Sequence, residues 1–149
     1  MPFVDVFIQF LEHGEGLDLP SYESAGSSGA DLKAAIDDQL EIASNSVALI
    51  PCGFRIAIPD GYEGQVRSRS GLALKNSIFI LNSPGTIDSD YRGEVKLIVA
   101  NFSADPFVVE RGMRLAQLVI CPVYKANFIN STDLPKTERN ESGFGSTGV

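Results

Sequence analysis

Short apolar runs alternate with turn-forming residues along most of the chain. The runs are rich in Val, Ile and Phe, which favours β-strands over helices. The segments between them contain Gly, Pro, Asn and Asp, which are typical of turns. This pattern predicts strands at residues 4–10, 47–50, 54–58, 77–81, 94–102, 107–109 and 115–123. It predicts turns at residues 51–53, 58–64, 82–93 and 110–112.

One segment departs from the strand pattern. SGLALKNS, at residues 70–77, predicts a brief helix. We therefore expect an all-β fold, a jelly-roll-like barrel or sandwich with one short helix. The apolar periodicity stops near Asn130. Residues 1–130 are expected to form a single domain, and residues 131–149 a mobile C-terminal arm.

Length and composition narrow the class of protein. With 149 residues, the chain is long enough for one domain with a substantial core. No stretch approaches the ~20 apolar residues of a membrane span, and no signal peptide is visible at the N-terminus. Cys52 and Cys121 lie in apolar surroundings, so we expect buried, reduced thiols and a cytoplasmic location. With these two cysteines and His13 alone, a structural zinc site is not expected.

The charge is unevenly distributed. Residues 1–66 carry eleven acids and two bases, a net of −9, and residues 67–149 carry eight acids and ten bases, a net of +2, which together give the formal charge of −7. A net negative chain argues against nucleic acid as a partner. The basic residues of the second half could still bind a small polyanion.

Two polar stretches in the first half of the chain carry candidate chemistry. In GSSGADLKA, at residues 26–34, Asp31 is either a turn-capping residue or a carboxylate directed at a metal or its water. In GYEGQVRSRSGLALK, at residues 61–75, Arg69, Ser70 and Gly71 stand at the start of the predicted helix. Ser70 is a candidate N-cap that leaves backbone N–H groups open for phosphate oxygens. The alternative is an ordinary helix cap with exposed arginines.

The region between the strands at 77–81 and 94–102 predicts a long hairpin. Asn82, Asp88, Asp90, Tyr91 and Arg92 are denser there than a turn requires. Backbone groups at a hairpin mouth can pair with the edge of a planar base, and an aromatic ring supplies a flat wall. Strand alternation would place the two aspartates on the same face, so spacing does not choose between them.

Two further stretches lie near the C-terminus. In VERGMRLAQL, at residues 109–118, Gln117 is either a satisfied amide in a strand or a residue that lines a site. In GFGSTGV, at residues 143–149, the glycines have the spacing of a dinucleotide-binding turn. Only Val149 follows, so the helix of that motif cannot form. The stretch is either a frayed end or an arm whose Phe144 closes over something flat.

Together, these five stretches resemble the motifs of the trimeric deoxyuridine triphosphatases (dUTPases). They occur in the same order and at similar spacing over residues 26–148, and LNSPGTIDSDYRGE and GFGSTG are the most specific. The chain departs from the family pattern in four places. Ser68 stands where many relatives have Pro, Met113 where an acid is frequent, and Asn140 and Ser142 where the tail often has Gly.

The resemblance implies a function and an assembly. The family cleaves dUTP to dUMP and pyrophosphate with Mg²⁺, which limits uracil incorporation into DNA and supplies dUMP for thymidylate synthesis. It folds as a jelly-roll-like barrel and forms homotrimers with active sites at the subunit interfaces.

The resemblance also assigns residue roles. Asp88 would be the general base for the attacking water, although composition alone leaves Asp90 as a competitor. Asp31 would hold the metal through water. Phosphate binding falls to Arg69, Ser70, Gly71, Gln117 and, from another subunit, Arg139. The uracil edge would pair with the Asn82 amide and the backbone at Thr86, Ile87 and Lys96.

The remaining assigned roles concern the sugar and the arm. Tyr91 would pack on the deoxyribose and exclude a 2′-hydroxyl, and Phe144 with Gly145 would close over the uracil ring. Two alternatives stay open at this point: a dCTP deaminase-type relative, and a non-catalytic nucleotide-sensing module of the same fold.

Overall fold

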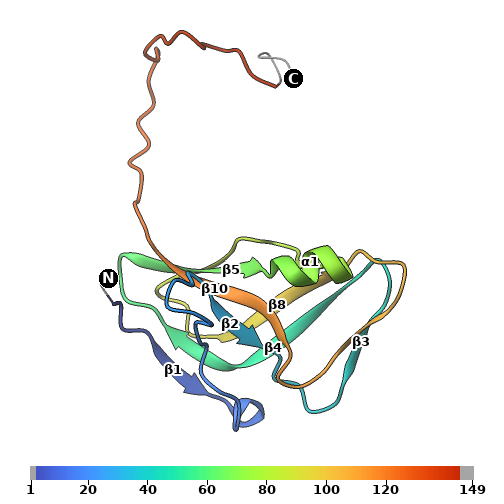
Figure 1. Cartoon of the computed structure of the whole chain (residues 1–149). Helices are drawn as coiled ribbons and strands as arrows, with labels where there is room; N and C mark the ends of the chain where they lie inside the picture. Colours follow the sequence, from blue (N-terminus) through green and yellow to red (C-terminus); the bar gives the residue numbers. More distant parts are fainter. Residues whose placement is uncertain (1–2, 145–149) are drawn as a thin grey trace.

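The computed structural model describes residues 3–144 and contains two four-stranded antiparallel sheets. The first sheet has the order β1 (Phe7–Phe10), β4 (Ser46–Ala57), β8 (Glu94–Asn101), β6 (Ile78–Ile80). The second has the order β2 (Ala30–Lys33), β10 (Arg114–Pro122), β5 (Tyr62–Ser68), β7 (Gly85–Ile87). A small pair, β3 (Leu40–Ile42) with β9 (Phe107–Val109), completes the strands, and the helices are α1 (Ser70–Asn76) and the 3-10 turn η1 (Glu12–Gly14). The expected all-β fold with one short α-helix is confirmed (Figure 1).

The core is formed by the inward faces of both four-stranded sheets. Alternate residues of β8, such as Val95, Leu97 and Val99, are buried and contribute to the same apolar cluster as Leu32 of β2 and Leu118 of β10. Alternation between inward apolar and outward polar residues is the expected pattern for sheets that pack face to face. The strand β8, which begins at the end of the predicted hairpin, is therefore anchored in the core.

Two of the predicted strands are one strand. Residues 47–50 and 54–58 were expected to be separated by a turn at Pro51–Gly53, but β4 continues from Ser46 to Ala57. The register against β8 shifts between Pro51 and Arg55, which indicates a bulge. Gly53 has φ +74°, a conformation open to glycine, so the extra residues are absorbed without ending the strand.

The predicted hairpin at 80–96 is also more complex than expected. β6 and β8 do pair, but β7 lies between them in sequence and pairs with β5 of the other sheet. The chain therefore crosses from one sheet to the other and back. The strands β2, β3, β5 and β7 were not predicted, because they are short or contain polar and glycine residues that weaken the apolar pattern.

The helix prediction is confirmed, but its cap is different. Arg69, not Ser70, is the N-cap, with φ −87° and ψ 126°, and it makes no side-chain cap hydrogen bond. Ser70 is the first helical residue. The helix ends at Asn76. Its C-cap, Ser77, has a left-handed conformation and donates its N–H to the Leu72 carbonyl.

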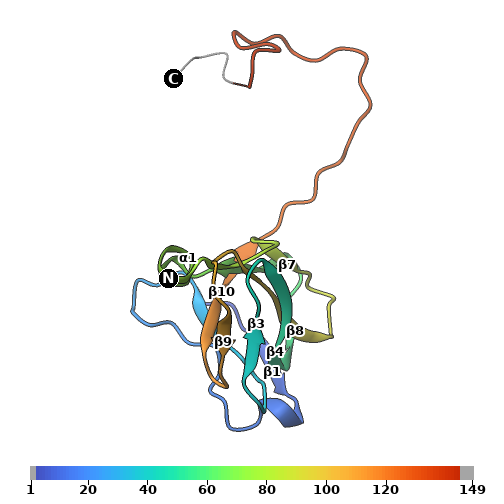
Figure 2. The ribbon, with the colours of Figure 1, turned by 90° about the vertical axis from the view of Figure 1, so that its right-hand side faces the viewer.

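The C-terminal segment leaves the sheets after β10. Residues 123–144 contain no helix or strand, and they extend away from the body in both views (Figure 1, Figure 2). Regular structure thus ends at Pro122, earlier than residue 130. The division into a domain and an arm stays a prediction. Among residues 3–144, no helix is long and apolar enough to cross a membrane.

Candidate active site

A pocket of about 300 Å³ opens beside β7 and the first half of β8. It is lined by Leu49, Thr86, Ile87, Asp88, Tyr91, Glu94, Val95, Lys96 and Ile98. Five of the predicted site residues meet here: Thr86, Ile87, Asp88, Tyr91 and Lys96. The pocket combines an apolar wall with two carboxylates, an ammonium group and a tyrosine, and such a mixture of apolar and polar groups is typical of a small-ligand site.

Asp88 and Tyr91 are held in a single turn at the end of β7. The Tyr91 N–H donates to the Asp88 carbonyl at 3.1 Å, and Arg92 donates to the carbonyls of Ser89 and Tyr91. Residues 88–91 are therefore not a strand, and the expectation that strand alternation puts Asp88 and Asp90 on one face does not apply. A turn takes over because the backbone is bonded within itself instead of to a neighbouring strand.

The ring of Tyr91 is fixed by the two residues before and at the start of β8. Its hydroxyl donates to the Glu94 carbonyl at 2.8 Å. A Cβ on Gly93 would lie 2.3 Å from the Tyr91 Oη, so the ring passes directly over the glycine. The ring can hold this position only while position 93 has no side chain.

Asn82 lies at the other end of the crossing segment, outside the residues that line this pocket. Its amide nitrogen would be 2.9 Å from a Cβ on Gly85, so it lies against the start of β7. Ser68 holds the same region, because its Oγ accepts the Ile80 N–H at 2.9 Å. Ser68 thereby ties β5 to β6.

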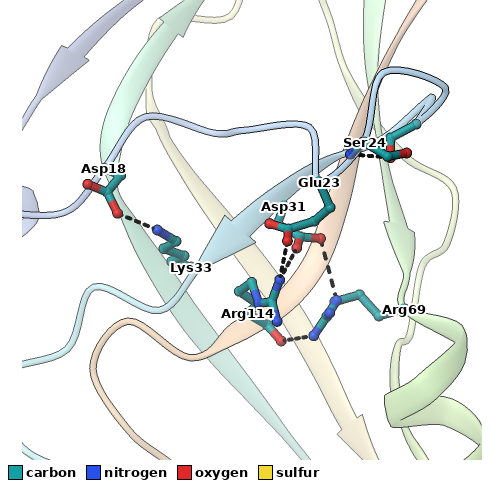
Figure 3. Close-up of polar contacts among 8 residues, drawn as sticks. Asp18, Glu23, Ser24, Asp31, Lys33, Arg69 and Arg114 are labelled. Atoms are coloured by element: carbon teal, nitrogen blue, oxygen red, sulfur yellow. Dashed lines mark hydrogen bonds and ion pairs between the residues drawn. The ribbon is translucent and has the colours of Figure 1, made fainter.

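A second group of predicted residues surrounds Asp31 in β2 (Figure 3). Asp31 is only 1% exposed. Its Oδ2 accepts from Arg114 Nη1 at 3.1 Å, and its Oδ1 lies 3.4 Å from Arg69 Nε. Arg69 also donates to the Arg114 carbonyl at 2.9 Å. Because a buried carboxylate is tolerated only when it is paired, the two arginines account for its burial.

Gln117 and Glu23 complete this group. In the register of the second sheet, Gln117 of β10 lies opposite Asp31 of β2 on one side and opposite Arg67 of β5 on the other. Glu23 reaches the same Arg114 nitrogen as Asp31 does, at 3.1 Å. Glu23 and then Asp31 raise the pKa of the Arg114 guanidinium, through hydrogen bonding and charge. Arg114 therefore supports the group as a permanent cation.

The group around Asp31 offers few oxygen ligands for Mg²⁺. Within residues 3–144, no group of three or more His, Cys, Asp or Glu side chains is placed to hold a metal ion directly. Asp31 Oδ1 has no hydrogen-bond partner in that range, because the approach of Arg69 is an ion pair without hydrogen-bond geometry. Mg²⁺ keeps several waters and takes one or two carboxylates plus substrate phosphates. One orphaned carboxylate oxygen fits a role outside the metal's direct ligands.

A larger cavity of about 630 Å³ lies on the other side of Asp88. Its lining includes the carboxylates of Asp60, Glu63, Asp88 and Asp90, with Lys125 as its one basic side chain. Such a wall repels a polyanion at short range. The smaller pocket, with Lys96 and an apolar wall, is the better candidate for a nucleotide.

Three predicted residues fall in the C-terminal segment. Arg139 is exposed and donates from Nε to the Ser142 carbonyl at 2.8 Å, and Phe144 is fully exposed. Gly145 lies outside the described residues. Asn140 has φ +42°, a region that asparagine tolerates better than most residues. The backbone at position 140 is therefore compatible with asparagine.

The predicted site residues thus form separate groups in one chain. Those of the pocket and those around Asp31 are not brought into one cavity, and the tail residues touch neither group within residues 3–144. Three residues next to these groups were missed: His13, Glu23 and Glu94. Glu94 adjoins the predicted hairpin, so its place beside Tyr91 could have been noticed, whereas nothing local pointed to His13 or Glu23.

Comparisons with known proteins cover nearly the whole chain. The dUTPase family model matches residues 15–148. The deoxyuridine 5′-triphosphate nucleotidohydrolase of Rhizobium johnstonii is 56% identical over 141 residues, which cover 93% of this chain and 90% of that protein. The same enzyme of Sinorhizobium medicae is 52% identical over 147 residues, covering 97% and 92%.

Solved structures share the fold at lower identity. The dUTPase of Staphylococcus bacteriophage 80alpha with dUpNHpp has a TM-score of 0.82 at 24% identity, covering 97% of this chain and 99% of that one. A mutant dUTPase of phage phi11 of S. aureus, described with a structural Mg(II) ion, has a TM-score of 0.78 at 21% identity, covering 89% and 99%. Because the family model spans most of the chain and its bacterial relatives share more than half of their residues with it over nearly their full length, this chain belongs to the dUTPase family.

Proposed function

We propose that this protein hydrolyses dUTP to dUMP and pyrophosphate. One observation supports this most directly: Thr86, Ile87, Asp88, Tyr91 and Lys96 line a single pocket, as the family motif requires. The relatives that share 52–57% of its residues are deoxyuridine 5′-triphosphate nucleotidohydrolases. The protein therefore acts as a dUTP diphosphatase.

The pocket suits uracil by its polar backbone and limited volume. Backbone groups at Thr86, Ile87 and Lys96 bind the uracil edge. The Asn82 amide, which lies against Gly85 outside the pocket lining, would turn toward that edge when uracil binds. Cytosine presents an amino group where uracil presents a carbonyl, so buried polar groups would be left unpaired. The close backbone leaves no space for the methyl group of thymine.

Tyr91 selects the sugar. Its ring lies over Gly93 with the hydroxyl bound to the Glu94 carbonyl, so its orientation is fixed before substrate arrives. A flat ring packed on C2′ of the deoxyribose excludes a 2′-hydroxyl. Preorganisation of this kind lowers the entropic cost of binding.

Asp88 orients and deprotonates the water that attacks the α-phosphorus. It is exposed at the rim of the pocket, and its carbonyl is held by the Tyr91 N–H. A carboxylate is ionised at neutral pH and can act as a general base when it is within reach of the water. One turn therefore positions both the base and the sugar wall.

The triphosphate is bound by positive groups around Asp31. Arg69, whose guanidinium is braced by Asp31 and by the Arg114 carbonyl, binds phosphate oxygens together with Ser70, Gly71 and Gln117. A bound Mg²⁺ would offset the phosphate charge and polarise the P–O bonds. Asp31 Oδ1 would hold this ion through water, as its lack of a hydrogen-bond partner among the described residues supports.

The complete site requires more than one chain. The pocket and the group around Asp31 are separate in a single chain. The tail extends away from the two sheets (Figure 1). Val47 and Leu49 on β4 and Tyr124 and Phe128 in the tail are exposed apolar residues that an interface would cover. We propose a homotrimer in which the tail of one subunit brings Arg139, Phe144 and Gly145 to another subunit's site.

The test is pyrophosphate release from dUTP, dCTP, dTTP, dATP, dGTP and UTP, with ammonia release from dCTP measured in parallel. We expect hydrolysis of dUTP alone. Ammonia from dCTP would identify a deaminase, and binding of dUTP without turnover would identify a sensing module. Asp88→Asn should retain dUTP binding and lose activity by several orders of magnitude. Asp90→Asn is the matched control, and loss of activity there but not in Asp88→Asn would refute the assignment of the base.

A further inference from the structure

Glu94 uses both its backbone and its side chain to connect the pocket to the N-terminal turn. Its carbonyl accepts the Tyr91 hydroxyl at 2.8 Å. Its Oε1 accepts the Gly53 N–H at 3.1 Å and the His13 Nε2–H at 2.5 Å. The side chain of Glu94 is 14% exposed, and that of His13 is 34% exposed. The hydrogen bond between His13 and Glu94 is therefore partly shielded from water, at the edge of the pocket that contains Tyr91.

These side-chain bonds replace backbone pairing that is missing at this point. The register between β4 and β8 runs regularly to the pair of Pro51 and Lys96, and then shifts before the pair of Arg55 and Glu94. Glu94, the first residue of β8, therefore begins its strand opposite a bulge. Its carboxylate fills the bulge and binds the Gly53 N–H there. Without that bond, Glu94 can detach from the end of β8. Its carbonyl, which accepts the Tyr91 hydroxyl, would then move with it.

His13 presents its ring from a turn that is itself firmly anchored. The Leu11 N–H donates to the Gly53 carbonyl at 2.8 Å. Arg111 donates to the His13 carbonyl at 2.8 Å and to the Glu15 carbonyl at 2.9 Å. The imidazole thus reaches Glu94 from a fixed support, 81 residues away in sequence.

The charges around this pair leave His13 as its main partner. Lys96 Nζ lies 3.8 Å from Glu94 Oε2, and its side chain is 45% exposed. An exposed ammonium at that distance contributes little, because solvent screens it. The short bond to His13 and the bond to Gly53 are therefore what fixes the carboxylate.

We propose that His13 and Glu94 are positioning residues that hold Tyr91 against the sugar side of the pocket, so that the N-terminal turn helps to set the selectivity for dUTP over UTP. The inference rests on the proposed function, because it concerns the sugar that Tyr91 contacts. His13 lies outside the lining of the pocket, and both residues act through the Glu94 carbonyl that orients the Tyr91 ring.

The experiment measures kcat/KM for dUTP and for UTP in His13→Ala, Glu94→Ala, Glu94→Gln and the double variant His13→Ala/Glu94→Ala. Loss of a hydrogen bond of this kind changes an equilibrium constant by about 5- to 10-fold. We therefore expect the ratio of kcat/KM for dUTP to kcat/KM for UTP to fall by about that factor in each alanine variant. Glu94→Gln keeps an oxygen acceptor and should retain most of the ratio. Because the two residues act in series, the double variant should be no worse than Glu94→Ala alone.

Asp18→Asn is the matched control, since it removes an exposed ion pair, that of Asp18 with Lys33 at 2.7 Å, away from the pocket. Its ratio should equal that of the wild type. Melting temperatures are measured for all variants, and if Glu94→Ala does not fold, the half-exposed His13→Ala decides the question. An unchanged ratio in folded His13→Ala overturns the inference, and so do additive effects in the double variant. Wild-type protein that releases no pyrophosphate from dUTP would instead overturn the proposed function.

Discussion

Replacing Gly93 with alanine tests whether the position of the Tyr91 ring controls the active site. The new Cβ would lie 2.3 Å from the Tyr91 Oη, 2.5 Å from its Cζ and 2.9 Å from its Cε2. Non-bonded carbon atoms are in optimal contact at about 3.5–4.0 Å, so the ring must move by about 1 Å. The three nearest atoms all belong to Tyr91, and Gly93 is not among the glycines with positive φ. The backbone conformation therefore accepts alanine, and the Tyr91 ring is the nearest group that has to give way.

The expected change in stability is small. Moving the ring removes the bond from the Tyr91 hydroxyl to the Glu94 carbonyl, which contributes about 1 kcal/mol. Glycine-to-alanine replacement restricts the unfolded chain and stabilises by about 0.4–1 kcal/mol. The two terms nearly cancel, so the melting temperature should change by only a few degrees.

The expected change in activity is large. A displacement of about 1 Å in a positioning group can lower the rate about 10²-fold. We therefore expect kcat/KM for dUTP to fall by about that factor in Gly93→Ala. Tyr91→Ala, which removes the ring, should lower the dUTP/UTP ratio, and the ratio of Gly93→Ala should approach it. Both are measured as pyrophosphate release, with a thermal melt on the same preparations.

Gly26→Ala is the matched control, because a Cβ there meets no atom within 4 Å. It should have wild-type activity and selectivity. If Gly93→Ala is folded and keeps the wild-type kcat/KM and ratio, Tyr91 is not the sugar wall. If it loses activity only because it unfolds, Gly93 is needed for folding and the reasoning about the ring is refuted.

Three further predictions concern the bulge, the tail and the thiols. In Gly53→Ala, the new Cβ would lie 2.4 Å from the Gly14 Cα, and residue 53 has φ +74°. The free energy of unfolding, measured in urea, should therefore fall by about 2–3 kcal/mol. A nearly unchanged value would contradict the close packing of the two glycines. Deletion of the residues after Lys136 should leave the melting temperature nearly unchanged and sharply lower kcat/KM. Verified mixed trimers of this deletion with Asp88→Asn chains should recover partial activity, because some sites then combine an intact Asp88 with an intact tail. No recovery would mean that each tail serves its own chain. Burial and the nearby Glu94 raise the pKa of the Cys52 thiol, so this thiol stays protonated at pH 8. Iodoacetamide should therefore label the half-buried Cys121 first, as peptide mapping would show. Faster labelling of Cys52 would refute its burial.

The parts of this protein that the sequence determined are those with local causes. The strands β6, β8, β9 and β10 were predicted because alternating or continuous apolar runs identify buried strand faces. The helix at 70–76 was predicted from the change in that pattern. Five pocket residues lie within residues 86–96, so one motif carries them together whatever the rest of the chain does.

The parts that only the tertiary structure decided depend on partners distant in sequence. β7 leaves the expected hairpin because it pairs with β5, and short polar strands carry no signal for their partner. The Pro51–Gly53 segment continues a strand because β8 lies beside it and Glu94 fills the bulge. Such pairings are selected by the packing of the whole core, which no local pattern records.

The same reason explains which side chains were missed. Asp31 meets Arg114 across 83 residues, and His13 meets Glu94 across 81. The sequence identified Asp31 as a candidate site carboxylate. Its burial between two arginines, however, follows from the pairing of β2 with β10. His13 carried no local signal at all, because its role exists only where the N-terminal turn lies against the bulge of β4.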